Sequence, residues 1–197
     1  MRIQHYILII VCCFVASCYD THFQPRKRGY YEIPLPKKEY VQFADASYPY
    51  TFSYPKYGRT VKDTLFFGEK ADNPYWMNID FNEIGGKLYL TYKPIASAAQ
   101  YKVLHDEAFK LSYAHNKKAT GIAEPEFHTK NNVHGIFFEI SGNVASEIQF
   151  FATDSHKHFI RGSLYFEATP NADSLAPASK FLIKDIEHFI ETLQWTR

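Results

Sequence analysis

The residues best placed to do chemistry lie together between Asp154 and His158. Asp154, His156 and His158 are potential metal ligands, and the run from Asp154 to His156 contains the residue types of a hydrolytic triad. Neighbouring strand residues point to opposite faces, so these side chains converge poorly on one metal ion. Adjacent residues also cannot make the hydrogen bonds of a triad in series. We therefore predict a solvated turn here, with no metal and no catalytic residue.

Other catalytic and cofactor motifs are missing from the sequence. It has no G-x-S-x-G elbow, no P-loop, no G-x-G-x-x-G, no H-E-x-x-H and no Cys/His spacing typical of zinc. The formal net charge is +1, from 22 basic and 21 acidic residues, which gives no bias toward nucleic acid. We predict a protein that is not an enzyme, needs no cofactor and binds no nucleic acid.

A second chemical signal is the position of the cysteines, all three of which lie within the first 18 residues. Arg2 and the apolar run over residues 6–15, which is short for a membrane span, are typical of a signal peptide. The sequence VASC that ends at Cys18 resembles a bacterial lipobox, in which the cysteine thiolate accepts a diacylglycerol. We favour a lipoprotein with signal peptide 1–17 and lipidated Cys18. The alternatives are an ordinary signal peptide with a stray cysteine and an uncleaved signal anchor.

A tether and a single domain are expected after Cys18. Residues 18–29 lack periodicity, and their basic run at residues 26–28 could touch anionic lipid, although a solvated linker is the simpler interpretation. Residues 30–197 provide enough chain for one domain with its own core.

Alternating apolar residues predict that this domain is rich in β-structure. Three runs between residues 133 and 167 have a period of two and are separated by turn formers. This pattern is typical of an antiparallel meander with one buried face, to which we assign Phe138, Phe150 and Leu164. Residues 121–132 are expected to form a polar loop. Further strands are expected over residues 30–33, 40–43, 48–54, 75–81 and 87–92, and residues 61–67 are a short apolar segment.

Two helices are predicted to pack against the strands. Ser97-x-x-Gln100 is a capping box that begins a helix over residues 97–118. Ser174 is the predicted N-cap of a terminal helix, with Pro177 in its first turn. The apolar stripe of this helix should cover the meander. The predicted fold class is α+β: an antiparallel sheet with a C-terminal meander, packed against helices.

Two surfaces are candidates for recognition. Tyr48, Tyr50, Phe52 and Tyr54 fall on one face of a strand and could bind glycan or peptide, although we favour a core role. The other is the meander face opposite the terminal helix, where aromatic residues accompany an arginine. The helix over residues 97–118 could instead cover this face, with Arg161 paired internally with Glu139 or Glu147, and we weigh this alternative slightly higher. The candidate partner residues are Phe137, Asp154, Ser155, His158, Arg161 and Tyr165.

Long stretches of the sequence resemble one family. The segment NNVHGIFFEISGNVASEIQFFATDSHKHFIRGSLYFEATPNADSLAP and the closing IEHFIETLQW are similar to the gliding motility lipoprotein GldD family of the Bacteroidetes. The upstream YPYTFSYPKYGRTVKDTLFFG, NPYWMNIDF and GGKLYLTYK match the same family, as does the lipobox cysteine. The order of strands and helices also resembles a PsbP-type α/β/α sandwich, a weaker likeness at the level of the fold.

The resemblance implies an envelope lipoprotein required for surface gliding and linked to type IX secretion, without an assigned catalytic residue. We expect a non-catalytic accessory component that binds envelope proteins of this machinery and is held in the membrane by Cys18. Residues 19–23 lack the acidic run that tends to direct surface display in this phylum, so we expect the domain to face the periplasm, at the outer membrane. The alternatives are a glycan- or peptidoglycan-binding module resting on the tyrosine row, and a hydrolase around Asp154, His158 and Arg161.

Overall fold

The computed structural model describes residue 29 and residues 34–63, 65–66, 69–70 and 72–196. The chain divides into units Met1–Tyr31 and Glu32–Arg197, and the helices and strands given below all belong to the second unit. Cys18, the predicted signal peptide and the predicted strand over residues 30–33 lie outside the described residues. The strands are β1 Tyr40–Phe43, β2 Tyr50–Pro55, β3 Arg59–Lys62, β4 Leu65–Phe66, β5 Glu69–Lys70, β6 Met77–Phe81, β7 Gly86–Pro94, β8 Ala119–Ala123, β9 Glu126–His128, β10 His134–Gly142, β11 Ile148–Thr153, β12 His158–Phe166 and β13 Gln194–Trp195. The helices are α2 Ala98–Tyr113, the 3₁₀ helix η1 Ala114–Lys117, and α3 Ala172–Thr192.

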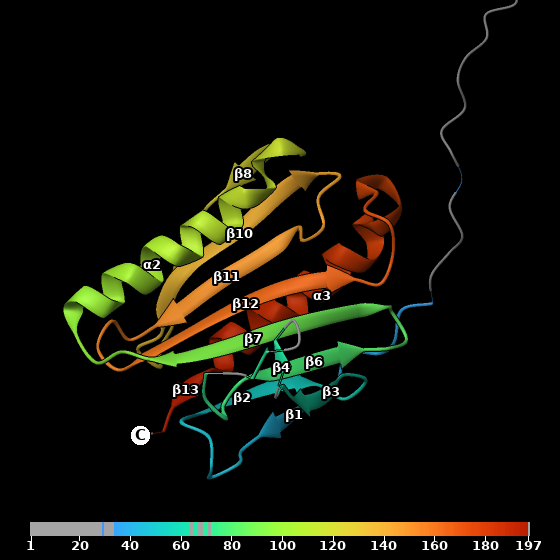
Figure 1. The fold of residues 1–197 in the computed structure, drawn as a ribbon. Helices are drawn as coiled ribbons and strands as arrows, with labels where there is room; N and C mark the ends of the chain where they lie inside the picture. The colour runs from blue at the N-terminus through green and yellow to red at the C-terminus, as the bar shows by residue number, and fades with distance from the viewer. Residues whose placement is uncertain (1–28, 30–33, 64, 67–68, 71, 197) are drawn as a thin grey trace, which may run out of the picture. The chain divides into compact units, whose positions relative to one another are not determined.

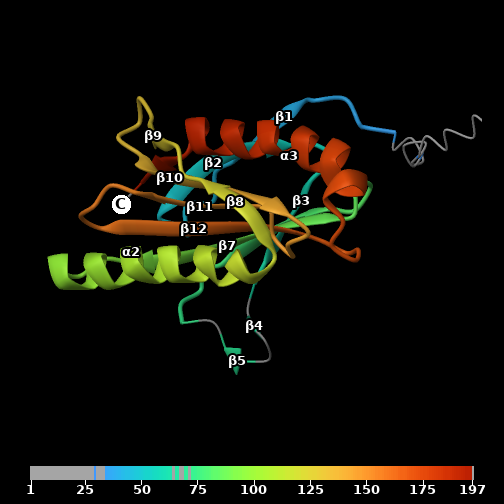
Figure 2. The same ribbon diagram turned by 90° about the horizontal axis from the view of Figure 1, so that it is seen from above.

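An eight-stranded antiparallel sheet forms the centre of this unit. Its strand order is β3-β6-β7-β12-β11-β10-β8, with β9 also paired to β10. Helix α2 lies against one face of the sheet and α3 against the other (Figures 1 and 2). A second sheet, β1-β2-β13, packs beside α3, and its strand β2 belongs to the same hydrophobic core as that helix. The α+β fold class expected from the sequence is confirmed.

Both faces of the meander are buried, because a helix packs on each of them. The strand register shows which side chains face which helix. Phe137 is paired with Phe150, which is paired with Gly162, so this row faces α3. Phe138 is paired with Gln149 and faces α2. The assignment of Phe138 to the same face as Phe150 is therefore wrong. A strand between two helices has no solvent face, and all six residues of β11 are buried.

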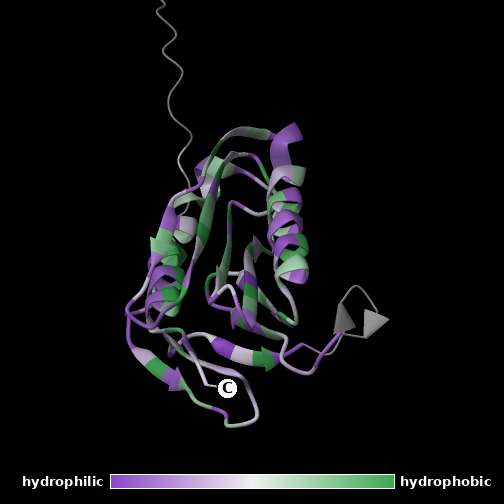
Figure 3. Ribbon diagram, turned by 90° about the vertical axis from the view of Figure 1, so that its left-hand side faces the viewer, coloured by the Kyte–Doolittle hydropathy of each residue, from purple (hydrophilic) through white to green (hydrophobic). Residues whose placement is uncertain are grey.

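The two helices pack differently. Helix α3 buries large apolar residues, among them Leu182, Ile186 and Phe189, in the main core. Helix α2 turns only Leu104, Ala108 and Ser112 fully inward, and most of its other residues remain partly or fully exposed. Each helix carries hydrophilic and hydrophobic segments side by side (Figure 3). Because two of the three inward residues of α2 are small, they fill little of the space between this helix and the sheet.

Three local predictions differ from the structure. Residues 121–132, expected to form a loop, contain most of β8 and all of β9, whose pairing with β10 does not depend on apolar alternation. The N-cap of α3 is Asn171 rather than Ser174, since the Asn171 side chain accepts a hydrogen bond from the Ser174 amide. Helix α2 begins after Ser97 as predicted, but it ends at Tyr113, where a 3₁₀ turn follows.

The tyrosine row is part of the core. Tyr48, Tyr50 and Phe52 are buried, and Tyr50 is 0% exposed. The Tyr50 hydroxyl donates to the carbonyl of Tyr75 at 2.6 Å, which satisfies its polar end. The row is therefore not a glycan-binding surface, and the core interpretation is confirmed.

Candidate functional site

The hairpin between β11 and β12 is held together by its own polar groups. The Asp154 carboxylate accepts hydrogen bonds from the backbone amides of His156, Lys157 and His158 at 2.8–2.9 Å. Burial by itself opposes ionisation, but these three bonds outweigh it and hold the pKa of Asp154 below its ordinary value. Ser155 adopts a positive φ of 63° at the tip. Asp154 is thus a structural acceptor in this turn.

His158 points away from the hairpin tip into the core. Its Nδ1 lies 2.9 Å from the Tyr92 hydroxyl, and its ring stacks on Trp195 at 4.9 Å between centroids. Arg161 lies on the opposite face of the same strand, toward α2. The hydrolase hypothesis needs Asp154, His158 and Arg161 to converge, and the strand separates the last two. Among the described residues, no cluster of three or more His, Cys, Asp or Glu side chains could hold a metal ion.

Phe137 forms part of the floor of a groove on the α3 side of the sheet. The groove has a volume of about 700 Å³ and lies between residues 125–131, which include β9, and the C-terminal half of α3. We call it the Phe137 groove. Its apolar lining consists of Phe127, Phe137 and Ile190 together with Pro125.

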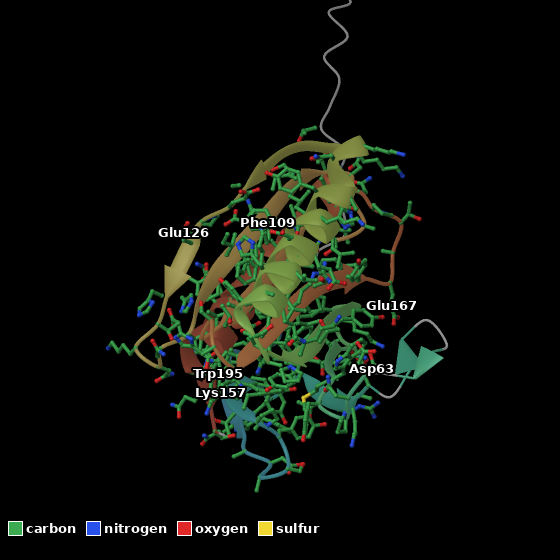
Figure 4. The ribbon with its side chains drawn as sticks, turned by 60° about the vertical axis from the view of Figure 1, so that its left-hand side comes forward. Asp63, Phe109, Glu126, Lys157, Glu167 and Trp195 are labelled. Atoms are coloured by element: carbon green, nitrogen blue, oxygen red, sulfur yellow. The ribbon has the colours of Figure 1, made fainter. Side chains whose placement is uncertain are left out.

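The rim of the Phe137 groove is acidic. Four glutamates line it and only one lysine does; these residues are Glu126, Glu139, Glu187, Glu191 and Lys130. Glu187 is paired with the neighbouring Lys184 at 2.7 Å. Glu126 stands on β9 at the edge of the sheet (Figure 4). Asn131 fixes one wall by donating hydrogen bonds to the backbone carbonyls of Glu191 and Leu193. An apolar floor with a negative rim is suited to a partner segment that is both basic and apolar.

The Phe137 groove continues toward the hairpin tip through two histidines. His128, which lines the groove, stacks on His134 with ring centroids 5.9 Å apart. His134 Nε2 lies 2.7 Å from the hydroxyl of Ser155. Burial, followed by the nearby His128, lowers the pKa of His134. Ser155 and Asp154 are therefore connected to the groove by a continuous chain of contacts.

Arg161 and Tyr165 line a second hollow, on the α2 side of the sheet. This cavity of about 400 Å³ lies between α2 and strands β7 and β12, and we call it the Arg161 pocket. Tyr165 is 36% exposed and contacts Tyr89 edge-on at 5.7 Å. Arg161 donates a hydrogen bond from Nη2 to Oε1 of Gln149, and not to Glu139 or Glu147.

The six predicted partner residues fall into three places rather than on one surface. Asp154, Ser155 and His158 belong to the hairpin, and Arg161 and Tyr165 line the Arg161 pocket. Phe137 lies on the opposite face, where the register places it beside Phe150. Helix α2 covers this face, as the alternative that we weigh higher predicts. The internal pairing of Arg161 with a glutamate is wrong, since Arg161 bonds to Gln149. Phe109 stands on α2 (Figure 4). Its ring packs edge-on against Phe138, with ring centroids 5.2 Å apart.

Sequence reasoning missed the residues that form the groove rim. Glu126 and Lys130 lie in the segment expected to be a loop. Glu187 and Glu191 lie on the outer side of the terminal helix, whose packing was predicted from its apolar stripe alone. The spacing of Glu187 and Glu191, four residues apart on one helix face, was a usable signal. Nothing local indicates that residues 125–131 fold over that helix.

Fold and site together define an α+β domain with a hollow on each side of its large sheet. The chain belongs to the gliding motility lipoprotein GldD family, whose model matches residues 20–195. No curated protein matches the sequence. The solution structure of cyanobacterial PsbP (CyanoP) from Synechocystis sp. PCC 6803 is similar over 82% of this chain and 95% of its own, with 10% sequence identity and a TM-score of 0.46. Within the described residues, no helix is long and apolar enough to cross a membrane.

Proposed function

We propose that this gliding motility lipoprotein is a non-catalytic accessory component of the gliding and type IX secretion apparatus. It stabilises a partner envelope protein by direct contact through the Phe137 groove. Acylation at Cys18 holds it in the outer membrane, with the domain facing the periplasm. The observation that carries the proposal is the groove itself, an apolar floor of about 700 Å³ with four glutamates and one lysine around it.

The groove has the physical properties of a protein-binding site. Its floor includes the half-buried Phe127 and the exposed Pro125, whose apolar surface a partner can cover. Phe137 and Ile190 are already largely buried. Its charges lie at the rim, where they remain solvated and influence encounter rate and specificity more than final affinity. The partner segment should therefore carry lysine or arginine beside apolar residues.

Charge reversal in the groove tests the proposal in living cells. A Glu126→Lys, Glu191→Lys double variant should lose gliding when it replaces the wild-type chain, because it makes the rim repel a basic partner. A matched control, Glu83→Lys with Glu167→Lys, changes the net charge equally at two exposed positions outside the groove and should glide normally. Protein levels and melting temperatures of both variants must match the wild type.

A photo-cross-linking residue at Lys130 identifies what the groove contacts. We expect a cross-link to one envelope protein in wild-type and control cells. This cross-linked product should be absent in the groove variant. Normal gliding and an unchanged cross-link in the groove variant would contradict the proposal. Protease treatment of intact cells tests the orientation, since a periplasmic domain should resist digestion until the outer membrane is opened.

A further inference from the structure

Arg161 is a partly buried arginine without a carboxylate partner in the described part of the chain. Its Nη2 donates to Oε1 of Gln149, and its Nε is buried without any hydrogen-bond partner. The Glu107 carboxylate attracts the guanidinium without a hydrogen bond to it. This carboxylate lies 3.6 Å from the ammonium of Lys93. The guanidinium has five N–H donors in a planar fork, and the one on Nε is buried without a partner here.

An uncompensated charge of this kind costs stability. Burial lowers the pKa of Arg161, because the low-dielectric surroundings disfavour the cation. Two further polar groups nearby are buried without partners, the Nε2 of Gln149 and the hydroxyl of Ser163. Gln149 and Ser163 are paired in register on adjacent strands, next to Arg161. Buried polar groups without partners are rare in folded proteins, and each needs an explanation. Gln149 and Ser163 do not line the pocket themselves, but they lie behind Arg161, which does.

The other charged groups of the Arg161 pocket are already engaged or neutral. Lys93 lies 3.6 Å from Glu107 and 3.8 Å from Asp72. Burial, followed by the charge of Arg161, lowers the pKa of His115, so that its imidazole is neutral at pH 7. Arg161 therefore provides the one uncompensated positive charge among the described residues around the pocket.

The pocket beside Arg161 is large enough for a small amphipathic molecule. Its volume of about 400 Å³ lies within the range of ligand sites, which runs from roughly 300 to 1,000 Å³. Ala108 of α2 and Ala114 of η1, both small, line the helical side of this space. Tyr165, 36% exposed, stands where the pocket meets solvent. The apolar wall residues are Trp76, Leu104, Ala108, Leu111, Ala114 and Phe159.

We propose that the Arg161 pocket binds an amphipathic monocarboxylate, a medium-chain fatty acid in chemical class. The carboxylate pairs with the Arg161 guanidinium, and the alkyl chain lies against the apolar wall between α2 and the sheet. A single negative charge fits better than a phosphate dianion, because Lys93 is already paired with Glu107 and Arg161 alone is left to balance the ligand. A wall made mostly of apolar side chains offers few partners for the backbone groups of a peptide.

Tryptophan fluorescence gives a direct readout, because Trp76 lines the pocket and Trp195 packs on His158 elsewhere. The experiment uses the mature chain with Cys18→Ala, which removes the acyl group, and Trp195→Phe, which leaves Trp76 as the single reporter. Decanoate should change the emission saturably and raise the melting temperature. Decanol, which has the chain without the charge, and acetate, which has the charge without the chain, should each bind at least tenfold more weakly.

Variants assign the head-group contact to Arg161. Arg161→Gln should weaken decanoate binding at least tenfold, and Arg161→Lys should weaken it less, since it keeps the charge but not the fork. Arg59→Gln, the same change at an exposed position outside the pocket, should bind decanoate normally. If Arg161→Gln does not fold, the Arg161→Lys variant and the comparison of decanoate with decanol still decide the question.

Three results would overturn the inference. The first is the lack of a saturable signal with decanoate in the wild-type pocket. The second is equal binding of decanoate and decanol, which would show that the guanidinium takes no part. The third is that a short peptide with an apolar C-terminal residue binds more tightly than decanoate does. This result would show that the site recognises the C-terminal carboxylate of a peptide. None of these results bears on the Phe137 groove, which lies on the other side of the sheet.

Discussion

Asp185 offers a sharp test of what holds the domain together. This carboxylate is buried in α3 with its side chain 1% exposed, and it accepts a hydrogen bond from Lys38 at 2.7 Å. The hydroxyls of Tyr40, at 2.8 Å, and Tyr57 also donate to it. Burial, followed by the bond to Asp185, raises the pKa of both tyrosines, so they remain neutral donors at physiological pH. One carboxylate thereby connects α3 to the segment around β1 and to the turn after β2.

The expected cost of Asp185→Asn follows from this burial. Breaking a buried ion pair from one side costs about 3–5 kcal/mol. Lys38 is 31% exposed and recovers part of its hydration, so we expect a value near the lower end, about 3 kcal/mol. For a chain of this size, that loss corresponds to a fall of about 6–12 °C in the melting temperature.

The matched control is an ion pair of equal length on the surface. Lys56 and Glu39 are also 2.7 Å apart, but their side chains are 57% and 49% exposed. Glu39→Gln should leave the melting temperature close to that of the wild type, because solvent screens an exposed pair. Circular dichroism melts and urea titrations of both variants measure the difference. Equal losses for Asp185→Asn and Glu39→Gln would refute the reasoning, since burial is the feature that separates the two pairs.

Three further predictions concern the anchor, the sheet and the pH response. Cys18→Ala should leave the domain folded but prevent lipid attachment, so palmitate labelling or membrane association of that variant would contradict the lipoprotein assignment. Gly135→Ala should destabilise the chain by about 3 kcal/mol in urea unfolding, because the new Cβ would meet the carbonyl oxygen of Phe151 at 1.8 Å; Gly121→Ala, with no atom within 4 Å of its Cβ, is the near-neutral control. The pKa of His115 is lowered in the folded chain, so as the pH falls below about 6.5 this imidazole is protonated in the unfolded chain before it is protonated in the folded one. Stability should therefore decrease between pH 7 and pH 5, and His115→Gln should show a weaker decrease; an unchanged pH profile in that variant would argue against a buried neutral imidazole.

The sequence by itself determined the local structure of this protein well. The period-two runs predicted β10, β11 and β12, and the apolar stripe with Leu182, Ile186 and Phe189 predicted the helix that covers them. Ser97 marked the start of α2 because its hydroxyl accepts a hydrogen bond from the Gln100 amide, a contact between neighbours in the chain. Each of these signals depends on residues close together in sequence.

Tertiary structure alone decided which faces are covered and where the hollows lie. Alternation in the sequence shows that a strand has two faces, but it does not show which helix each face contacts. The register between β10 and β11, which pairs Phe138 with Gln149, decides this for Phe138. The same limit explains β8 and β9, which are strands because β10 offers them hydrogen-bond partners. The Phe137 groove and the Arg161 pocket combine elements far apart in the chain. Their residues are visible in the sequence, but packing decides which of them line a cavity and which lie in the core.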